Sequence, residues 1–231
     1  MTISLGSLKT FRRLFLRTEL NILLKTGMVG IYQPIPWLGV RNAKRCEGTL
    51  KRWEAINNEL RFAEGSVLDI GCDLGFFTFQ MARRGFFCIG IESEAMPYHI
   101  CNLIKEVGEF NNTVFVRATV DEQFCGKLPT VDVIIFLSVF HHIVRQFGLE
   151  TSTQLMLKLM QKTRKVLFFE TGQSNETNAS WARYLPAMTP NATLWIEDYF
   201  ISLGAARVRH LGNYETHLSP IKRSLFAVYM K

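Results

Sequence analysis

The stretch Val67-Leu-Asp-Ile-Gly-Cys-Asp-Leu-Gly-Phe-Phe77 decides the fold. It reads as a short apolar strand, then a turn that contains Gly71 and Gly75, then the start of a helix. Glycines at such a turn let the backbone bend sharply and approach a ligand closely. The free N–H groups at the start of the helix point to the same place. The sequence therefore predicts a ligand site where the first strand of an α/β sheet ends.

The alternation of strand and helix continues on both sides of this turn. Apolar runs typical of buried strands are Val67–Ile70, Phe86–Ile91, Val114–Val116, Val131–Leu137 and Val166–Phe169. Helical patterns lie at about Phe76–Arg84, Ala95–Val107, Thr151–Thr163 and Leu194–Leu203. Such an order indicates a Rossmann-like, doubly wound sheet that is mostly parallel. The last strands, Ala206–His210 and Leu225–Met230, are joined by a loop and are expected to pair antiparallel.

The first 62 residues have a different pattern and are expected to form a helical extension packed on a domain of residues 63–231. Residues 1–25 read as a basic amphipathic helix, and a second helix is predicted at about Ala43–Arg61. Three interpretations of the basic helix remain open: packing on the domain with its basic face in water, contact with a membrane surface, or an organellar transit peptide.

The composition is that of an ordinary globular protein, with 48% hydrophobic and 20% charged residues in a chain of 231. Apolar stretches such as Val131–Phe140 are far shorter than the ~20 residues that a membrane span requires. Five scattered cysteines without a C-x-x-C pair argue against a disulfide framework and against a metal site. We therefore expect a cytoplasmic protein, peripheral at the inner face of the membrane if its basic helix binds there. The net charge of +7 suggests an anionic partner such as nucleic acid, phosphorylated saccharide or acidic lipid.

The chemistry of the glycine turn favours one cofactor. Dinucleotide enzymes usually show G-x-G-x-x-G without an acid before the first glycine, because the pyrophosphate is already anionic. Here Asp69 precedes Gly71, and the glycine spacing is G-x-x-x-G. A carboxylate beside the turn suits a cofactor with cationic groups, such as S-adenosylmethionine (SAM) with its α-ammonium and sulfonium. The sequence therefore favours SAM over NAD.

Candidate cofactor contacts follow from the ends of the strands. Glu92 ends the second strand, where an acid can accept hydrogen bonds from ribose hydroxyls. Thr119 follows the third strand, near the expected adenine edge, whereas Asp121 is expected either to contact the cofactor or to cap the next turn. The predicted cofactor-binding residues are Asp69, Gly71, Cys72, Asp73, Gly75, Glu92, Thr119, Val120 and Ser138.

The segments Val67–Phe77, Gly90–Glu92 and Val131–Leu137 resemble the motifs of class I SAM-dependent methyltransferases. This resemblance covers residues 64–231 and implies a seven-stranded sheet. One departure is Asp73, because the family often has glycine at this position.

Two further segments resemble the methyltransferase domain of bifunctional kinase–methyltransferases that terminate bacterial O-antigen chains. They are Leu137-Ser-Val-Phe-His-His-Ile143 and Tyr214-Glu-Thr-His-Leu-Ser-Pro220. The resemblance is restricted to the methyl-transfer half and implies methylation of a phosphate at the end of a glycan. A looser likeness exists to tRNA wobble-uridine carboxymethyltransferases.

The acceptor chemistry leaves two interpretations. A sugar hydroxyl needs a general base, for which His141 or His142 would serve, although adjacent helical residues cannot both face one pocket. A phosphate monoester is already largely dianionic at pH 7 and needs cationic groups to hold it. The predicted catalytic residues are His142, His141, His217 and Arg223, with Lys222, Arg52 and Arg145 as further cations. Alternative functions are a tRNA-modifying or small-molecule methyltransferase and a non-catalytic SAM-binding protein, and nucleic acid is the less favoured partner.

Overall fold

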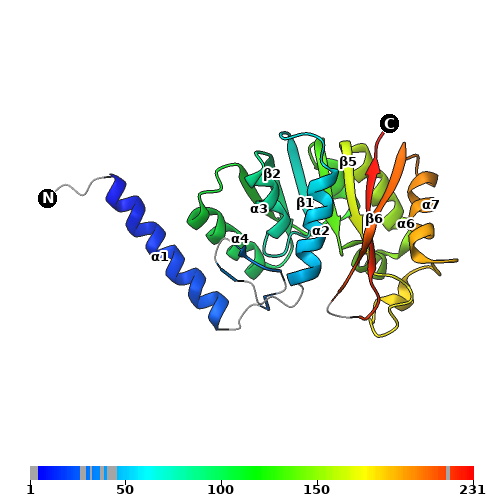
Figure 1. Cartoon of the computed structure of the whole chain (residues 1–231), viewed down its shortest axis with the longest axis horizontal. Helices are drawn as coiled ribbons and strands as arrows, with labels where there is room; N and C mark the ends of the chain where they lie inside the picture. Colours follow the sequence, from blue (N-terminus) through cyan, green and yellow to red (C-terminus); the bar gives the residue numbers. More distant parts are fainter. Residues whose placement is uncertain (1–4, 27–29, 32, 37–38, 41–45, 217–218) are drawn as a thin grey trace.

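The computed structural model describes residues 5–26, 30–31, 33–36, 39–40, 46–216 and 219–231, with side chains from residue 10 onward. Figure 1 shows a twisted sheet with helices on both faces and α1 at one edge of the molecule. The helices are α1 Leu5–Lys25, α2 Cys46–Glu59, α3 Phe76–Arg83, α4 Ala95–Gly108, α5 Glu122–Lys127, α6 Phe140–Gln161 and α7 Ala192–Ser202. The strands are β1 Ser66–Ile70, β2 Phe87–Glu92, β3 Thr113–Arg117, β4 Val131–Leu137, β5 Thr163–Glu170, β6 Arg207–Tyr214 and β7 Arg223–Tyr229.

These strands form one seven-stranded sheet in the order β3-β2-β1-β4-β5-β7-β6. Strands β1 to β5 run parallel, whereas β7 is antiparallel to both β5 and β6. The Rossmann-like fold class and the antiparallel carboxy-terminal strand predicted from the sequence are thereby confirmed. The order changes direction between β1 and β4, and in open α/β sheets ligands bind beyond the carboxyl ends of the strands at such a point.

Burial on both faces explains why the central strands are apolar throughout. Ile134 and Phe136 belong to a core cluster with side chains of α6 and α7, whereas Val133 and Ile135 belong to a cluster with side chains of α2 and α3. All four are 0% exposed. Since successive side chains of a strand point to opposite faces, a strand covered on both sides shows no polar alternation.

The structure differs from the prediction in three elements. Helix α6 starts at Phe140, eleven residues earlier than predicted, and Gly148 interrupts it with a φ of +80°. This non-helical residue broke the sequence pattern, so only the second half was recognised. The short α5 was not predicted, and Asp121 caps it by accepting a hydrogen bond from the N–H of Phe124 at 2.7 Å. Strand β6 is longer than predicted and includes Tyr214.

The amino-terminal helices pack on the rest of the chain in different ways. Leu20 and Leu24 of α1 are buried in a cluster with residues of α4. Ile56 and Leu60, in and just after α2, belong to the core between the sheet and α3. The predicted boundary at residue 62 stays a prediction, but α2 contributes directly to the core on this face. No helix in the described part of the chain is long and apolar enough to cross a bilayer.

A buried ion pair also fastens α2 to the carboxyl end of the sheet. The Arg52 guanidinium donates to the carboxylate of Glu170 at the end of β5, and the two side chains are 2% and 0% exposed. The same guanidinium donates to the backbone carbonyl of Glu215 at 3.2 Å. Removing one member of such a pair leaves the other as a buried charge without compensation.

Arg52→Met should therefore lower the free energy of unfolding by about 3–5 kcal/mol. The matched control is Lys51→Met, which removes an exposed cation paired with Glu47 at 2.6 Å and should change it by less than about 1 kcal/mol. Urea unfolding followed by circular dichroism measures both changes. Equal stabilities of the two variants would contradict the role of the buried pair.

Candidate active site

The glycine turn is held close to the loop that follows β4. The N–H groups of Gly71 and Cys72 donate to the carbonyl of Ile91 in β2, at 2.8 and 3.0 Å. Gly71 has a φ of +70°, and a Cβ atom there would lie 2.5 Å from a methyl carbon of Val139. Gly75 also has positive φ, at +77°. Neither position tolerates a side chain without strain, which agrees with the close backbone approach expected from the sequence.

Two of the predicted carboxylates, Asp69 and Glu92, form hydrogen bonds that hold the turn and the helix after it. Asp69 accepts a hydrogen bond from the hydroxyl of Thr78 in α3 at 2.6 Å. Burial raises the pKa of Asp69 to about 7. Glu92 accepts from the N–H groups of Asp73 and Glu94, both at 2.9 Å. Both carboxylates are buried and already accept hydrogen bonds from the protein. They stay candidate cofactor contacts, either because they position the turn or because their oxygens can accept further hydrogen bonds.

Asp73 stands out from the other residues of the turn. It adopts a φ of +51°, which is uncommon for a residue with a side chain and better tolerated by aspartate than by most. Its Oδ2 atom is buried and has no hydrogen-bond partner among the residues that the structure describes. Burial, reinforced by the charges of Glu92 and Asp69, raises its pKa to about 7. Asp73 lines the larger cavity, and a carboxylate there with one buried oxygen left without a described partner fits a nearby cationic group such as the ammonium or sulfonium of SAM.

Two adjoining cavities open at the carboxyl ends of the strands, and both are lined by Gly71, Val139 and His142. The larger, about 280 Å³, is further lined by Gln33, Thr49, Arg52, Asp73, Phe77, Leu137, Ser138 and Glu170. The smaller, about 140 Å³, is further lined by Ile70, Ile91, Ser93, Ala118, Thr119, Val120, Ile143 and Gln146. The structure thus brings together the turn, the segment after β3 and the segment after β4. Cys72 is 2% exposed and contributes to the turn through its backbone.

The two adjacent histidines lie in different environments. His142 is solvent-accessible at the junction of the two cavities. Desolvation, with the nearby cations Arg223 and Arg145, lowers its pKa below the usual 6.5, which favours the neutral imidazole. His141 is 2% exposed, accepts a hydrogen bond from the N–H of Gly172 at 2.9 Å and packs against Trp181 with ring centroids 4.3 Å apart. His141 therefore supports the segment after β5, whereas His142 faces the cavities.

Arg223, expected as an anion contact, is buried instead. It is 1% exposed, and its Nε and Nη2 donate to the two carboxylate oxygens of Glu176 at 2.8 and 2.9 Å. Its Nη1 donates to the Ser138 hydroxyl at 3.3 Å. A bidentate pair of this kind engages the fork of the guanidinium, so direct binding of an acceptor by Arg223 does not fit this geometry. Its placement instead fixes Ser138, a predicted cofactor contact at the start of the segment after β4.

The remaining expected cations contribute less to the cavities. Lys222 is exposed and lies 3.6 Å from the carboxylate of Glu215. His217, a predicted catalytic residue, lies outside the described residues. Several residues that line the cavities were not predicted from the sequence, among them the polar residues Glu170 and Gln33. Glu170 could have been found, because it ends β5 just as Glu92 ends β2. Gln33, which accepts from the N–H of Phe76 at 3.3 Å, lies in a turn-rich segment without any recognisable pattern.

Comparisons with known proteins find methyltransferases among the similar sequences and structures. The O-antigen chain terminator bifunctional methyltransferase/kinase WbdD of Escherichia coli is 27% identical over 164 residues, 71% of this chain and 22% of that protein. A crystal structure of WbdD matches 90% of this chain and 46% of that chain with a TM-score of 0.72. The ubiquinone biosynthesis O-methyltransferase of Histophilus somni is 28% identical over 156 residues, 64% of this chain and 62% of that protein. No family model matches the sequence.

A third likeness concerns the fold alone. The SAM-bound structure of magnesium protoporphyrin IX methyltransferase (ChlM) from Synechocystis PCC 6803 is 15% identical and matches with a TM-score of 0.55, over 79% of this chain and 77% of that chain.

In its fold and in its glycine turn, the chain is similar to SAM-dependent methyltransferases of the class I fold, although it spans only 22% of the WbdD sequence. Among such enzymes the chain resembles the methyltransferase part of WbdD, as the sequence motifs had indicated.

The carboxylate of Asp73 leads to a prediction about cofactor binding. The affinity for SAM should increase between about pH 6 and pH 7.5, because the carboxyl group, with a pKa of about 7, must ionise to pair with a cation. Asp73→Asn should weaken binding at about pH 7.5 roughly 10- to 150-fold, the effect of losing charge-assisted hydrogen bonds, and should flatten this pH dependence. Isothermal titration calorimetry measures both effects.

The control for this experiment is Asp198→Asn, which changes an exposed carboxylate on α7. It should leave both the affinity and its pH dependence unchanged. An Asp73→Asn variant that binds SAM as tightly as the wild-type protein at every pH would rule out Asp73 as a counter-ion of the cofactor.

Proposed function

We propose that the protein transfers the methyl group of SAM to an oxygen atom of a saccharide or of a glycan-linked group, in polysaccharide biosynthesis. The similarity to WbdD, named as an O-antigen chain terminator, supports a glycan acceptor. The similarity to an O-methyltransferase of ubiquinone biosynthesis supports an oxygen nucleophile. The observation that carries the proposal is the position of His142 at the junction of the two cavities.

The cofactor would lie across both cavities. Thr119 and Val120 in the smaller cavity are suited to the adenosine end, in line with their position after β3. Gly71 and Asp73 in the larger cavity are suited to the amino-acid end, where the carboxylate of Asp73 would pair with the ammonium. Bound SAM supplies a methyl group activated by its sulfonium. The task of the protein is then to align an acceptor oxygen with that methyl group.

His142 is suited to act as a general base on an acceptor hydroxyl. The hydroxyl oxygen would form a bond to the methyl carbon as the bond from that carbon to the sulfonium sulfur breaks, and its proton would pass to the neutral imidazole of His142. A lowered pKa keeps this imidazole unprotonated at neutral pH. General-base catalysis of this kind typically contributes 10²–10⁴-fold to the rate.

The environment of the two buried guanidinium groups supports a hydroxyl over a phosphate acceptor. A phosphate would need oriented cations to hold it. Arg223 already pairs with Glu176, and Arg52 already pairs with Glu170. Releasing either cation toward a ligand would leave a buried carboxylate without compensation. The resemblance to glycan-phosphate methyltransferases thus supports a glycan as the acceptor, whereas the local charges support a hydroxyl group as the nucleophile.

A matched pair of acceptors separates the two chemistries. Oligosaccharides that end in a free hydroxyl and the same oligosaccharides that end in a phosphate monoester would be offered with tritiated SAM, and bulk tRNA would serve as a third substrate. On the hydroxyl acceptor, His142→Ala should lower the single-turnover rate by about 10²–10⁴-fold. The wild-type rate should fall as the pH drops through a value below 6.5, because protonated imidazole cannot accept the proton.

The control is His210→Ala, which removes an exposed histidine on β6 and should leave the rate unchanged. Two results together would contradict the hydroxyl proposal. One is methyl transfer to the phosphate acceptor that falls only about 10-fold or less in His142→Ala. The other is a decrease in rate below about pH 6 that persists in this variant, because such a decrease would reflect the second ionisation of the phosphate. Transfer to tRNA alone would overturn the glycan acceptor.

A further inference from the structure

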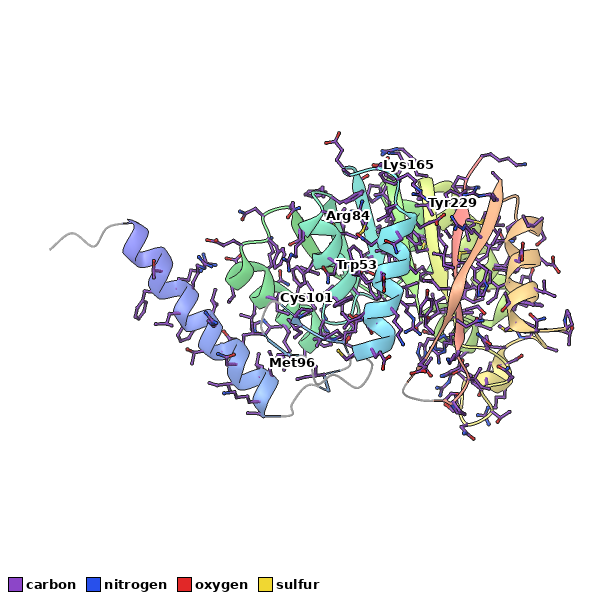
Figure 2. All side chains as sticks on the ribbon, in the orientation of Figure 1. Trp53, Arg84, Met96, Cys101, Lys165 and Tyr229 are labelled. Atoms are coloured by element: carbon purple, nitrogen blue, oxygen red, sulfur yellow. The ribbon has the colours of Figure 1, made fainter. Side chains whose placement is uncertain are left out.

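Helix α1 carries apolar side chains on two opposite sides. Leu16, Leu20, Leu23 and Leu24 pack in a cluster with residues of α4. Phe11, Leu14, Phe15 and Ile22 lie on the other side and are 72%, 63%, 66% and 55% exposed. We call these four residues the outer face of α1. Figure 2 shows side chains on α1 that extend away from the body of the molecule.

Polar contacts fix the orientation of α1 on the domain. Arg13 donates to the carboxylate of Glu109 at 2.7 Å and to the carbonyl of Val107 at 2.9 Å. Glu19, the single acidic residue in the sequence of α1, lies 2.8 Å from the ring of His99 in α4. Together with the buried leucines, these contacts hold the inner side against α4, so the outer face is presented to the surroundings.

Cations flank the outer face on both edges. A helix advances by 100° per residue, so Phe11, Phe15 and Ile22 lie within about 40° of one another. On the same projection Arg12 and Arg17 lie at about 100° and 240° from Phe11, one on each edge of the stripe. Arg12 also lies 3.3 Å from the carboxylate of Glu106 in α4, but its side chain is 71% exposed and so stays within reach of a lipid headgroup.

We propose that the outer face of α1 binds the surface of an anionic lipid membrane. A helix with bulky apolar side chains on one side and cations along its edges lies in the plane of the membrane interface, with its apolar side chains among the upper acyl chains and its cations at the headgroups. Large contiguous apolar patches are uncommon on monomeric soluble proteins and mark interaction sites. The net charge of +7 adds attraction to anionic headgroups.

The charge pattern argues for lipid over a second copy of this chain. In a symmetric contact between two outer faces, the cationic edges of one helix would face those of the other, and like charges disfavour association. The single carboxylate of α1, Glu19, lies at about 80° on the same projection and contacts the ring of His99, so it offsets only the edge that carries Arg12 and leaves the Arg17 edge cationic. An anionic membrane satisfies the apolar stripe and both cationic edges together.

Co-sedimentation of the full-length protein with lipid vesicles tests the proposal. Binding is expected on vesicles of phosphatidylcholine mixed with phosphatidylglycerol, should be weaker on phosphatidylcholine alone, and should decline as salt is added. The double variant Phe11→Ser/Phe15→Ser should bind about 10-fold less or weaker still, because burial of the two rings would be lost.

The matched control is Leu194→Ser/Ile201→Ser, which removes two apolar side chains of α7 that are 46% and 51% exposed, at the other end of the molecule (Figure 1). It should bind vesicles as the wild-type protein does. All variants should keep the wild-type circular dichroism spectrum and the wild-type rate of methyl transfer. Equal vesicle binding by the Phe11/Phe15 variant and the wild-type protein would overturn the proposal. No vesicle binding, combined with a dimer in analytical ultracentrifugation that the Phe11/Phe15 variant lacks, would overturn it in favour of a second copy.

Discussion

A chain of buried charged groups joins the elements around the larger cavity, and the geometry of the site depends on it. Arg52 of α2 binds Glu170 of β5, which accepts from the Ser138 hydroxyl at 2.6 Å. Ser138 in turn accepts from Arg223 of β7, which is paired with Glu176. Since a half-satisfied set of buried charges is more costly than either a complete set or none, these elements are held in one arrangement. The network therefore fixes the wall of the cavity rather than supplying free charges to a ligand.

Because Arg52 and Glu170 pair with each other, two ionisable residues that line the cavities remain available to a ligand, and their proposed roles differ. Asp73 lines the larger cavity and has one buried carboxylate oxygen without a described partner, and His142 lies at the junction of the two cavities with a lowered pKa. Both Asp73 and Ser138 have positive φ, at +51° and +61°, which is a conformation that side chains disfavour. Backbone conformations of this kind persist where surrounding contacts enforce them, and they are enriched at functional sites.

The sequence predicted the sheet well because its strands are apolar on both faces and glycines follow several of them. This pattern can be recognised from residues that are neighbours along the chain. It also predicted the glycine turn and a position for Thr119 and Val120 beside it, since the ends of strands set their positions, and both residues line the smaller cavity. It could not predict that Arg223 is neutralised by Glu176, because that pairing joins residues 47 positions apart along the chain. Gln33 was missed for the same reason: its place in the cavity depends on tertiary packing that no periodicity encodes.

The most direct test of the account is calorimetric titration of the protein with SAM, S-adenosylhomocysteine and NADH, together with one pair of glycine variants. Gly71 has no room for a Cβ atom beside Val139, whereas a Cβ atom at Gly126 would meet nothing within 4 Å. We expect SAM and S-adenosylhomocysteine to bind the wild-type protein and Gly126→Val, NADH to bind neither, and Gly71→Val to lose cofactor binding. Binding of NADH without SAM or S-adenosylhomocysteine, or full SAM affinity in a folded Gly71→Val, would contradict the assignment of the cofactor to this turn.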